Sequence, residues 1–113
     1  MTRVGGRVFR GPPLPDLFTL GQLSVTPSVN YLLDDVMLAN VFEMHASGQW
    51  ASPEDTLSHD DQEANERALR DRQGEVLSKY RVASKMGKAA EIYVSTILSR
   101  QQSYTVCFLP NER

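Results

Sequence analysis

Three segments near the C-terminus decide the fold: GEVLSKYRVAS (residues 74–84), EIYVSTILS (residues 91–99) and SYTVCFLP (residues 103–110). In each segment apolar side chains recur at every second position, which is the period of a β-strand. Short links at residues 85–88 and 100–102 favour hairpin turns, so we predict an antiparallel meander of three strands. The apolar residues that share a parity are Val76, Tyr80 and Val82, then Ile92, Val94 and Leu98, then Tyr104, Val106 and Phe108.

The residues before this meander predict one further strand and two or three helices. The segment LFTLGQLSV (residues 17–25) indicates an N-terminal strand with a bend or bulge at Gly21. Thr26 and Pro27 then form a helix start, and apolar residues follow at helical spacing to about residue 47. This stretch is either one helix or two that meet near residues 35–37. A further helix is expected from Ser58 to about residue 72. The predicted fold class is therefore α+β, with helices covering one face of the sheet in a two-layer arrangement.

Composition bounds the organisation of the chain. Residues 1–16 are rich in glycine and proline and carry Arg3, Arg7 and Arg10, so we expect a flexible basic arm. Residues 17–113 are long enough for a single domain with a modest core. One cysteine, no signal-like N-terminus and no long apolar run predict a cytoplasmic protein.

Charge is strongly segregated along the sequence. Residues 17–66 contain nine carboxylates and neither Lys nor Arg, whereas residues 67–113 contain nine Lys and Arg against four carboxylates. Such segregation bears on partners and on association rates rather than on fold. We expect an acidic surface that binds a basic protein partner, and Trp50 is either an aromatic contact of that surface or an anchor that fixes its loop to the core. The candidate partner-binding residues are Asp34, Asp35, Glu43, Trp50, Glu54 and Asp55.

No catalytic, cofactor or metal motif is present in the sequence. Cys107 lies in an alternating strand and His45 ends an apolar helical stripe, so both are expected to be structural. His45 and His59 have no zinc-ligand spacing, and no phosphate-binding glycine loop occurs. The sequence therefore predicts a protein without enzymatic activity, cofactor or metal.

Several short motifs resemble a family of small bacterial proteins carried on plasmids and phages, usually described as hypothetical. They cover about residues 17–113 and leave out the basic arm. This chain departs from the pattern at Gln49, in a longer loop before the second predicted helix, and at residues 93–96. The resemblance implies a mobile genetic element in a bacterial host, and it implies no catalytic residue. The motifs are LxxLGQLxxTP (residues 17–27), GxW (48–50), ANxxAL (64–69), LSxY (77–80) and LPxE (109–112).

Two functional hypotheses follow. The first is a non-enzymatic binding protein whose acidic surface binds the basic, nucleic-acid-binding surface of a host defence complex, as an anti-CRISPR or anti-restriction inhibitor would. The second is a small nucleic-acid-binding accessory protein, although a pI near 5.6 is low for that class. Its candidate residues are Arg3, Arg7, Arg10, Lys79, Arg81, Lys85 and Lys88.

Overall fold

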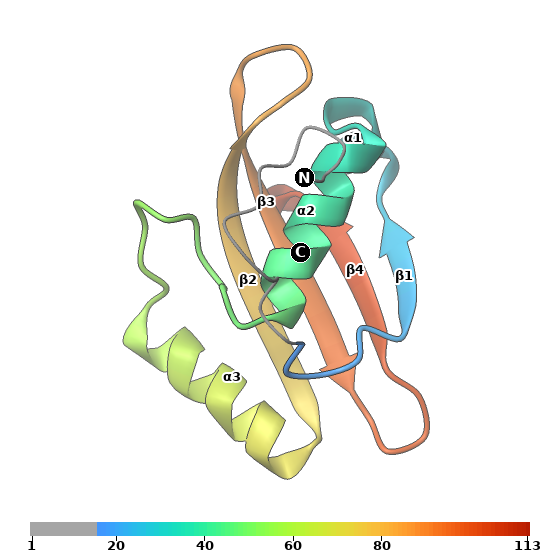
Figure 1. Cartoon of the computed structure of the whole chain (residues 1–113), viewed down its shortest axis with the longest axis vertical. Helices are drawn as coiled ribbons and strands as arrows, with labels where there is room; N and C mark the ends of the chain where they lie inside the picture. The colour runs from blue at the N-terminus through green and yellow to red at the C-terminus, as the bar shows by residue number, and fades with distance from the viewer. Residues whose placement is uncertain (1–15) are drawn as a thin grey trace, which may run out of the picture.

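The predicted meander forms the larger part of a four-stranded sheet. The computed structural model describes residues 16–113, so the predicted basic arm, apart from Asp16, lies outside the described residues. β2 (Gly74–Ala83), β3 (Ala89–Leu98) and β4 (Tyr104–Phe108) pair antiparallel in sequence order. β1 (Gln22–Val25) pairs parallel with β4, and the sheet order is β1-β4-β3-β2 (Figure 1). The predicted α+β class is confirmed.

β1 is shorter than the strand predicted for residues 17–25. The chain bends at Gly21, whose φ of 69° lies in the left-handed region that favours glycine. A Cβ there would lie 2.0 Å from the carbonyl oxygen of Ser103, so the backbone of β1 approaches the β3–β4 turn closely. Only the residues after this bend join the sheet. The residues before it run towards Ala46, whose carbonyl accepts a hydrogen bond from the Leu17 amide.

The helical stretch after β1 consists of two helices, α1 (Pro27–Leu32) and α2 (Asp35–Ala46). They are separate because Leu33 adopts an extended backbone and Asp34 caps α2, accepting a hydrogen bond from the Met37 amide. α2 lies across one face of the sheet (Figure 1). The main core between them contains Val29, Leu33, Leu38, Val41, Phe42, Tyr80, Ile92, Val94 and Cys107.

α3 (His59–Asp71) flanks the β2 edge of the sheet (Figure 1). Ser58 caps it as predicted, accepting a hydrogen bond from the Asp61 amide. Ala68 of α3 packs with Phe18, Val76 and Leu98 in a second apolar cluster. A final short 3₁₀ turn, η1 (Pro110–Glu112), follows β4. Among the described residues no α-helix covers the sheet face opposite α2, which we call the open face, and η1 contacts β3.

Candidate interaction site

The outer edge of β2 is covered by hydrogen bonds from two side chains and one backbone carbonyl. The Asn65 side chain donates to the Leu77 carbonyl and accepts from the Leu77 amide, both at 2.8 Å. Two residues further on, the Lys79 amide donates to the Trp50 carbonyl. The Ser52 hydroxyl accepts from the Arg81 amide and donates to its carbonyl. An edge strand normally exposes unpaired backbone groups, and here both groups of Leu77 and Arg81 and the amide of Lys79 are paired.

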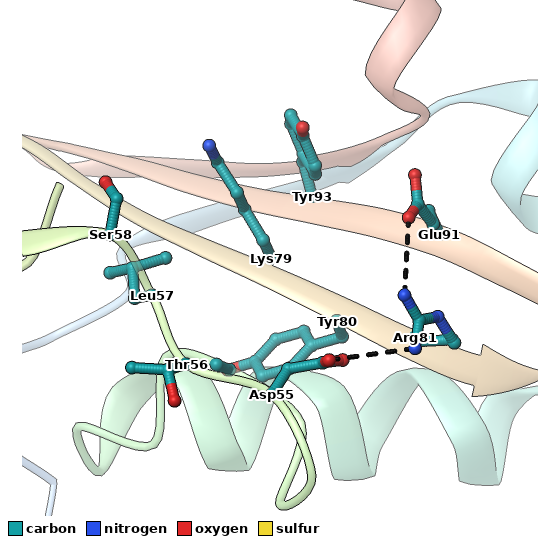
Figure 2. Close-up of a pocket in the computed structure, with 10 residues that line it drawn as sticks. Asp55, Thr56, Leu57, Ser58, Lys79, Tyr80, Arg81, Glu91 and Tyr93 are labelled. Atoms are coloured by element: carbon teal, nitrogen blue, oxygen red, sulfur yellow. Dashed lines mark ion pairs between the residues drawn. The ribbon is translucent and has the colours of Figure 1, made fainter.

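The loop of residues 51–58, which lies along β2, forms one wall of a groove of about 320 Å³. Figure 2 shows Arg81 between two carboxylates, with Asp55 at 3.6 Å and Glu91 at 3.9 Å. The Lys79 ammonium lies over the Tyr93 ring, 5.3 Å from its centroid. The groove is lined by Ala51, Asp55, Thr56, Leu57, Ser58, Lys79, Tyr80, Arg81, Glu91 and Tyr93.

Lys79, Arg81 and Arg113 each form an ion pair with a carboxylate of the same chain. The Lys79 ammonium lies 2.8 Å from the Asp61 carboxylate, and this contact lowers the pKa of Asp61 and raises that of Lys79. The Arg113 guanidinium reaches Glu75 at 3.0 Å. Phosphate binding needs Lys or Arg side chains that are free to neutralise the phosphate charge. Binding a phosphate chain at Lys79 or Arg81 would first require these internal pairs to break.

The other cations of the nucleic-acid hypothesis lie elsewhere. Lys85 and Lys88 are exposed in the β2–β3 turn, where the Lys85 amide donates to the Leu32 carbonyl at the end of α1. Arg3, Arg7 and Arg10 lie outside the described residues. The structure therefore brings Lys79 and Arg81 together on one strand and places the turn lysines beside α1.

The predicted acidic residues divide into two groups. Asp34 and Asp35 lie at the corner between α1 and α2, and Glu43 follows Asp35 by eight residues, about 12 Å along the helix. Glu54 and Asp55 belong to the loop before α3, on the other side of β2 in Figure 1. Asp55 is engaged by Arg81. The predicted acidic residues consequently do not form one continuous patch.

Trp50 is partly buried against the second apolar cluster. Its backbone carbonyl accepts from Lys79, and its indole nitrogen is buried without a hydrogen-bond partner among the described atoms. The Tyr80 hydroxyl donates to the carbonyl of the preceding residue, Gln49, at 2.5 Å. These contacts fix the loop to the sheet, which is a structural role for the tryptophan.

At the corner between α1 and α2, two large apolar side chains are exposed beside the carboxylates. Tyr31 is 68% exposed and Val36 is 46% exposed, and they flank Asp34 and Asp35 in the sequence. Asp34 keeps its capping hydrogen bond, and neither carboxylate forms an ion pair with a residue in the described part of the chain. Tyrosine is one of the residue types enriched in binding hot spots, so the exposed Tyr31 side chain is a candidate contact of this corner.

Sequence reasoning missed a buried polar chain in the core. His45, expected only at the end of an apolar stripe, is fully buried and bonds Ser78 at 2.6 Å and Thr96 at 2.9 Å. Thr105 donates to the Leu20 carbonyl, so it accepts from Thr96. Thr96 then accepts from Nε2–H of His45, and Ser78 donates to Nδ1. Burial lowers the pKa of His45 from 6.5 to about 3, so the ring is neutral.

Cys107 does not pair with this histidine. Both ring nitrogens of His45 bond hydroxyl groups, and Cys107 is fully buried in the main core. Burial raises the pKa of its thiol to about 12. The thiolate form that a nucleophile requires is therefore disfavoured at neutral pH.

Within residues 16–113 no group of three or more His, Cys, Asp or Glu side chains is arranged to hold a metal ion. Among the same residues, none of the helices has the length and apolar character that crossing a membrane requires. No protein-family model, curated protein or solved structure matches this chain. The resemblance to small plasmid- and phage-borne proteins therefore stays a prediction.

Proposed function

We propose that this chain is a non-catalytic binding protein of a mobile genetic element and that its α1–α2 corner binds a basic protein surface in the bacterial cytoplasm. The observation that carries the proposal is the distribution of ion pairs. Lys79, Arg81 and Arg113 are all engaged by carboxylates of the same chain, whereas Asp34 and Asp35 face solvent without a cation from the described residues.

Charge complementarity defines the kind of partner. Proteins that bind nucleic acid present basic surfaces, and a carboxylate cluster that competes for such a surface gains association rate and specificity. A host defence complex that holds nucleic acid is a partner of this kind. Exposed Tyr31 and Val36 beside the carboxylates supply the apolar contact that charge alone does not provide. Glu43 and Glu54 would extend the contact along α2 and the following loop.

The test neutralises carboxylates without disturbing the helix. Asn caps helices as well as Asp does, so Asp34→Asn with Asp35→Asn removes two charges and keeps the α2 cap. A matched control, Glu63→Gln with Glu66→Gln, removes two exposed charges from α3.

Tagged wild type, double variant and control are used to capture proteins from the host, with mass-spectrometric identification. We expect a basic nucleic-acid-binding protein to be captured by the wild type and the control, and to be lost with the corner variant. Equal capture by all three proteins would contradict the proposal. So would exclusive capture of proteins without a basic surface.

A further inference from the structure

The two edge strands of the sheet, β1 and β2, differ in whether their outward backbone groups have hydrogen-bond partners. Along β2, Asn65 pairs the outward amide and carbonyl of Leu77, Ser52 pairs those of Arg81, and the Trp50 carbonyl accepts from the Lys79 amide. β1, at the other edge, has β4 as its single neighbour, and Figure 1 shows it at the right-hand margin of the sheet. Because β1 bonds β4 through residues 22, 24 and 26, Leu23 and Val25 turn their backbone N–H and C=O groups outward. No described residue pairs with these groups.

The bare edge also lacks the charges that normally protect such strands. Residues 17–33 contain no Asp, Glu, Lys, Arg or His. On β1 itself, the Leu23 side chain is 50% exposed. Soluble proteins usually guard an open edge with a lysine, an inward charge or a covering segment. Depletion of charge together with an exposed apolar side chain is typical of the centre of a protein–protein interface.

We propose that β1 pairs antiparallel with β1 of a second copy, so that the two sheets join into one eight-stranded sheet about a two-fold axis at Ser24. In this register Leu23 of one copy and Val25 of the other exchange both backbone hydrogen bonds, and symmetry repeats the pair. The exposed Leu23 side chain then packs on Val25 of the other copy, on the side of the sheet that α2 covers.

The register follows from the ends of the strand. A shift by one pair in one direction would require Gly21, which is bent out of the strand with φ of 69°. A shift in the other direction would require Pro27, which has no N–H to donate. Only pairing centred on Ser24 satisfies the outward groups of both Leu23 and Val25. A copy of the same uncharged edge is complementary to it, so we commit to self-association, which is independent of the function proposed for the α1–α2 corner.

Sedimentation velocity on the full chain over a dilution series is the first test. We expect a reversible species with twice the monomer mass of 12.7 kDa. Leu23→Pro removes an N–H that bonds no described residue, and proline is tolerated where an edge strand faces solvent. It should weaken dimerisation at least about tenfold, because each dimer loses two inter-chain hydrogen bonds. A wild type that stays monomeric throughout the series overturns the proposal.

Cysteine cross-linking tests the register even if the proline variant folds poorly. Ser24 would face Ser24 of the other copy as a non-hydrogen-bonded pair, with Cα atoms about 4.5 Å apart, which a disulfide can span. Gln22 would lie about 14 Å along the strand from its own counterpart, given about 3.4 Å per residue. Mild oxidation should therefore link Ser24→Cys into a covalent dimer and leave Gln22→Cys monomeric. Equal cross-linking of the two variants, or none in either, refutes the proposed pairing.

Discussion

Acid sensitivity is expected to arise from one buried side chain, His45. In the folded protein burial lowers its pKa to about 3, whereas the unfolded chain has the ordinary value of 6.5. Between these two values the unfolded state binds a proton that the folded state does not. The free energy of unfolding therefore falls as pH decreases below 6.5 and recovers above it.

The magnitude follows from the two pKa values. At pH 5 the unfolded histidine is almost fully protonated and the folded one is neutral, which costs about 2 kcal/mol of stability relative to pH 7. The carboxylates with lowered pKa values, Asp61 and Glu112, have ordinary values of 3.8 and 4.5, so their effect is concentrated below pH 5. The interval from pH 7 to pH 5 therefore isolates His45.

Urea unfolding followed by the fluorescence of the single tryptophan, Trp50, measures this loss at each pH. The chain has two histidines, so His59 provides a matched control: it is exposed on α3, 3.6 Å from Glu63. His45→Gln should remove most of the change in stability between pH 7 and pH 5, and His59→Gln should retain it. If the wild type and His45→Gln lose equal stability over this interval, the assignment of a buried neutral histidine is wrong.

Three further outcomes are expected. Asn65→Ala leaves the buried backbone N–H and C=O of Leu77 unpaired and should lower the free energy of unfolding by about 2–4 kcal/mol in urea titrations, whereas an effect below about 0.5 kcal/mol would contradict the edge-covering role. Gly21→Ala places a Cβ 2.0 Å from the Ser103 carbonyl oxygen at a positive φ, so a melting temperature equal to that of the wild type would refute the close approach. Cys107 should react with a thiol reagent only as fast as the protein unfolds, and rapid reaction of the native protein would show that the thiol is accessible.

Periodicity predicted the sheet well because its signal is local. Alternation located β2, β3 and β4, and the cap residues Thr26 and Ser58 located the starts of α1 and α3. The parallel pairing of β1 with β4 could not be derived in the same way. This pairing joins residues about 80 positions apart. No local sequence pattern indicates whether a distant strand pairs with β4 or with β2.

The polar core escaped prediction for a different reason. In β4 the alternating residues Tyr104, Val106 and Phe108 lie on the open face, while Thr105 and Cys107 face α2. The apolar set therefore indicated the strand correctly but not its inward side. Three hydroxyl residues occupy core positions on adjacent strands because they satisfy His45 and one another: Ser78, Thr96 and Thr105. A sequence shows the residue types, but their convergence on one imidazole depends on register.

The motifs that carry the family resemblance also have structural explanations in this chain. Asn65 of ANxxAL covers the β2 edge, and Ser78 of LSxY bonds His45. Glu112 of LPxE accepts hydrogen bonds from the Leu109 amide and from Thr26. These motif residues therefore act in the folding of this chain, and they carry no information on its function.

Charge segregation along the sequence changes meaning once the chain is folded. Asp55 and Asp61 of the acidic stretch are the partners of Arg81 and Lys79 in the basic one, so part of the segregation is cancelled across the β2 edge. Exposed pairs of this kind each contribute no more than about 1 kcal/mol, and their larger consequence is to occupy the cations. A phosphate group that binds Lys79 or Arg81 would have to displace these carboxylates. Since Asp35 has no such partner among the described residues, a functional explanation of the acidic stretch has to begin with the α1–α2 corner.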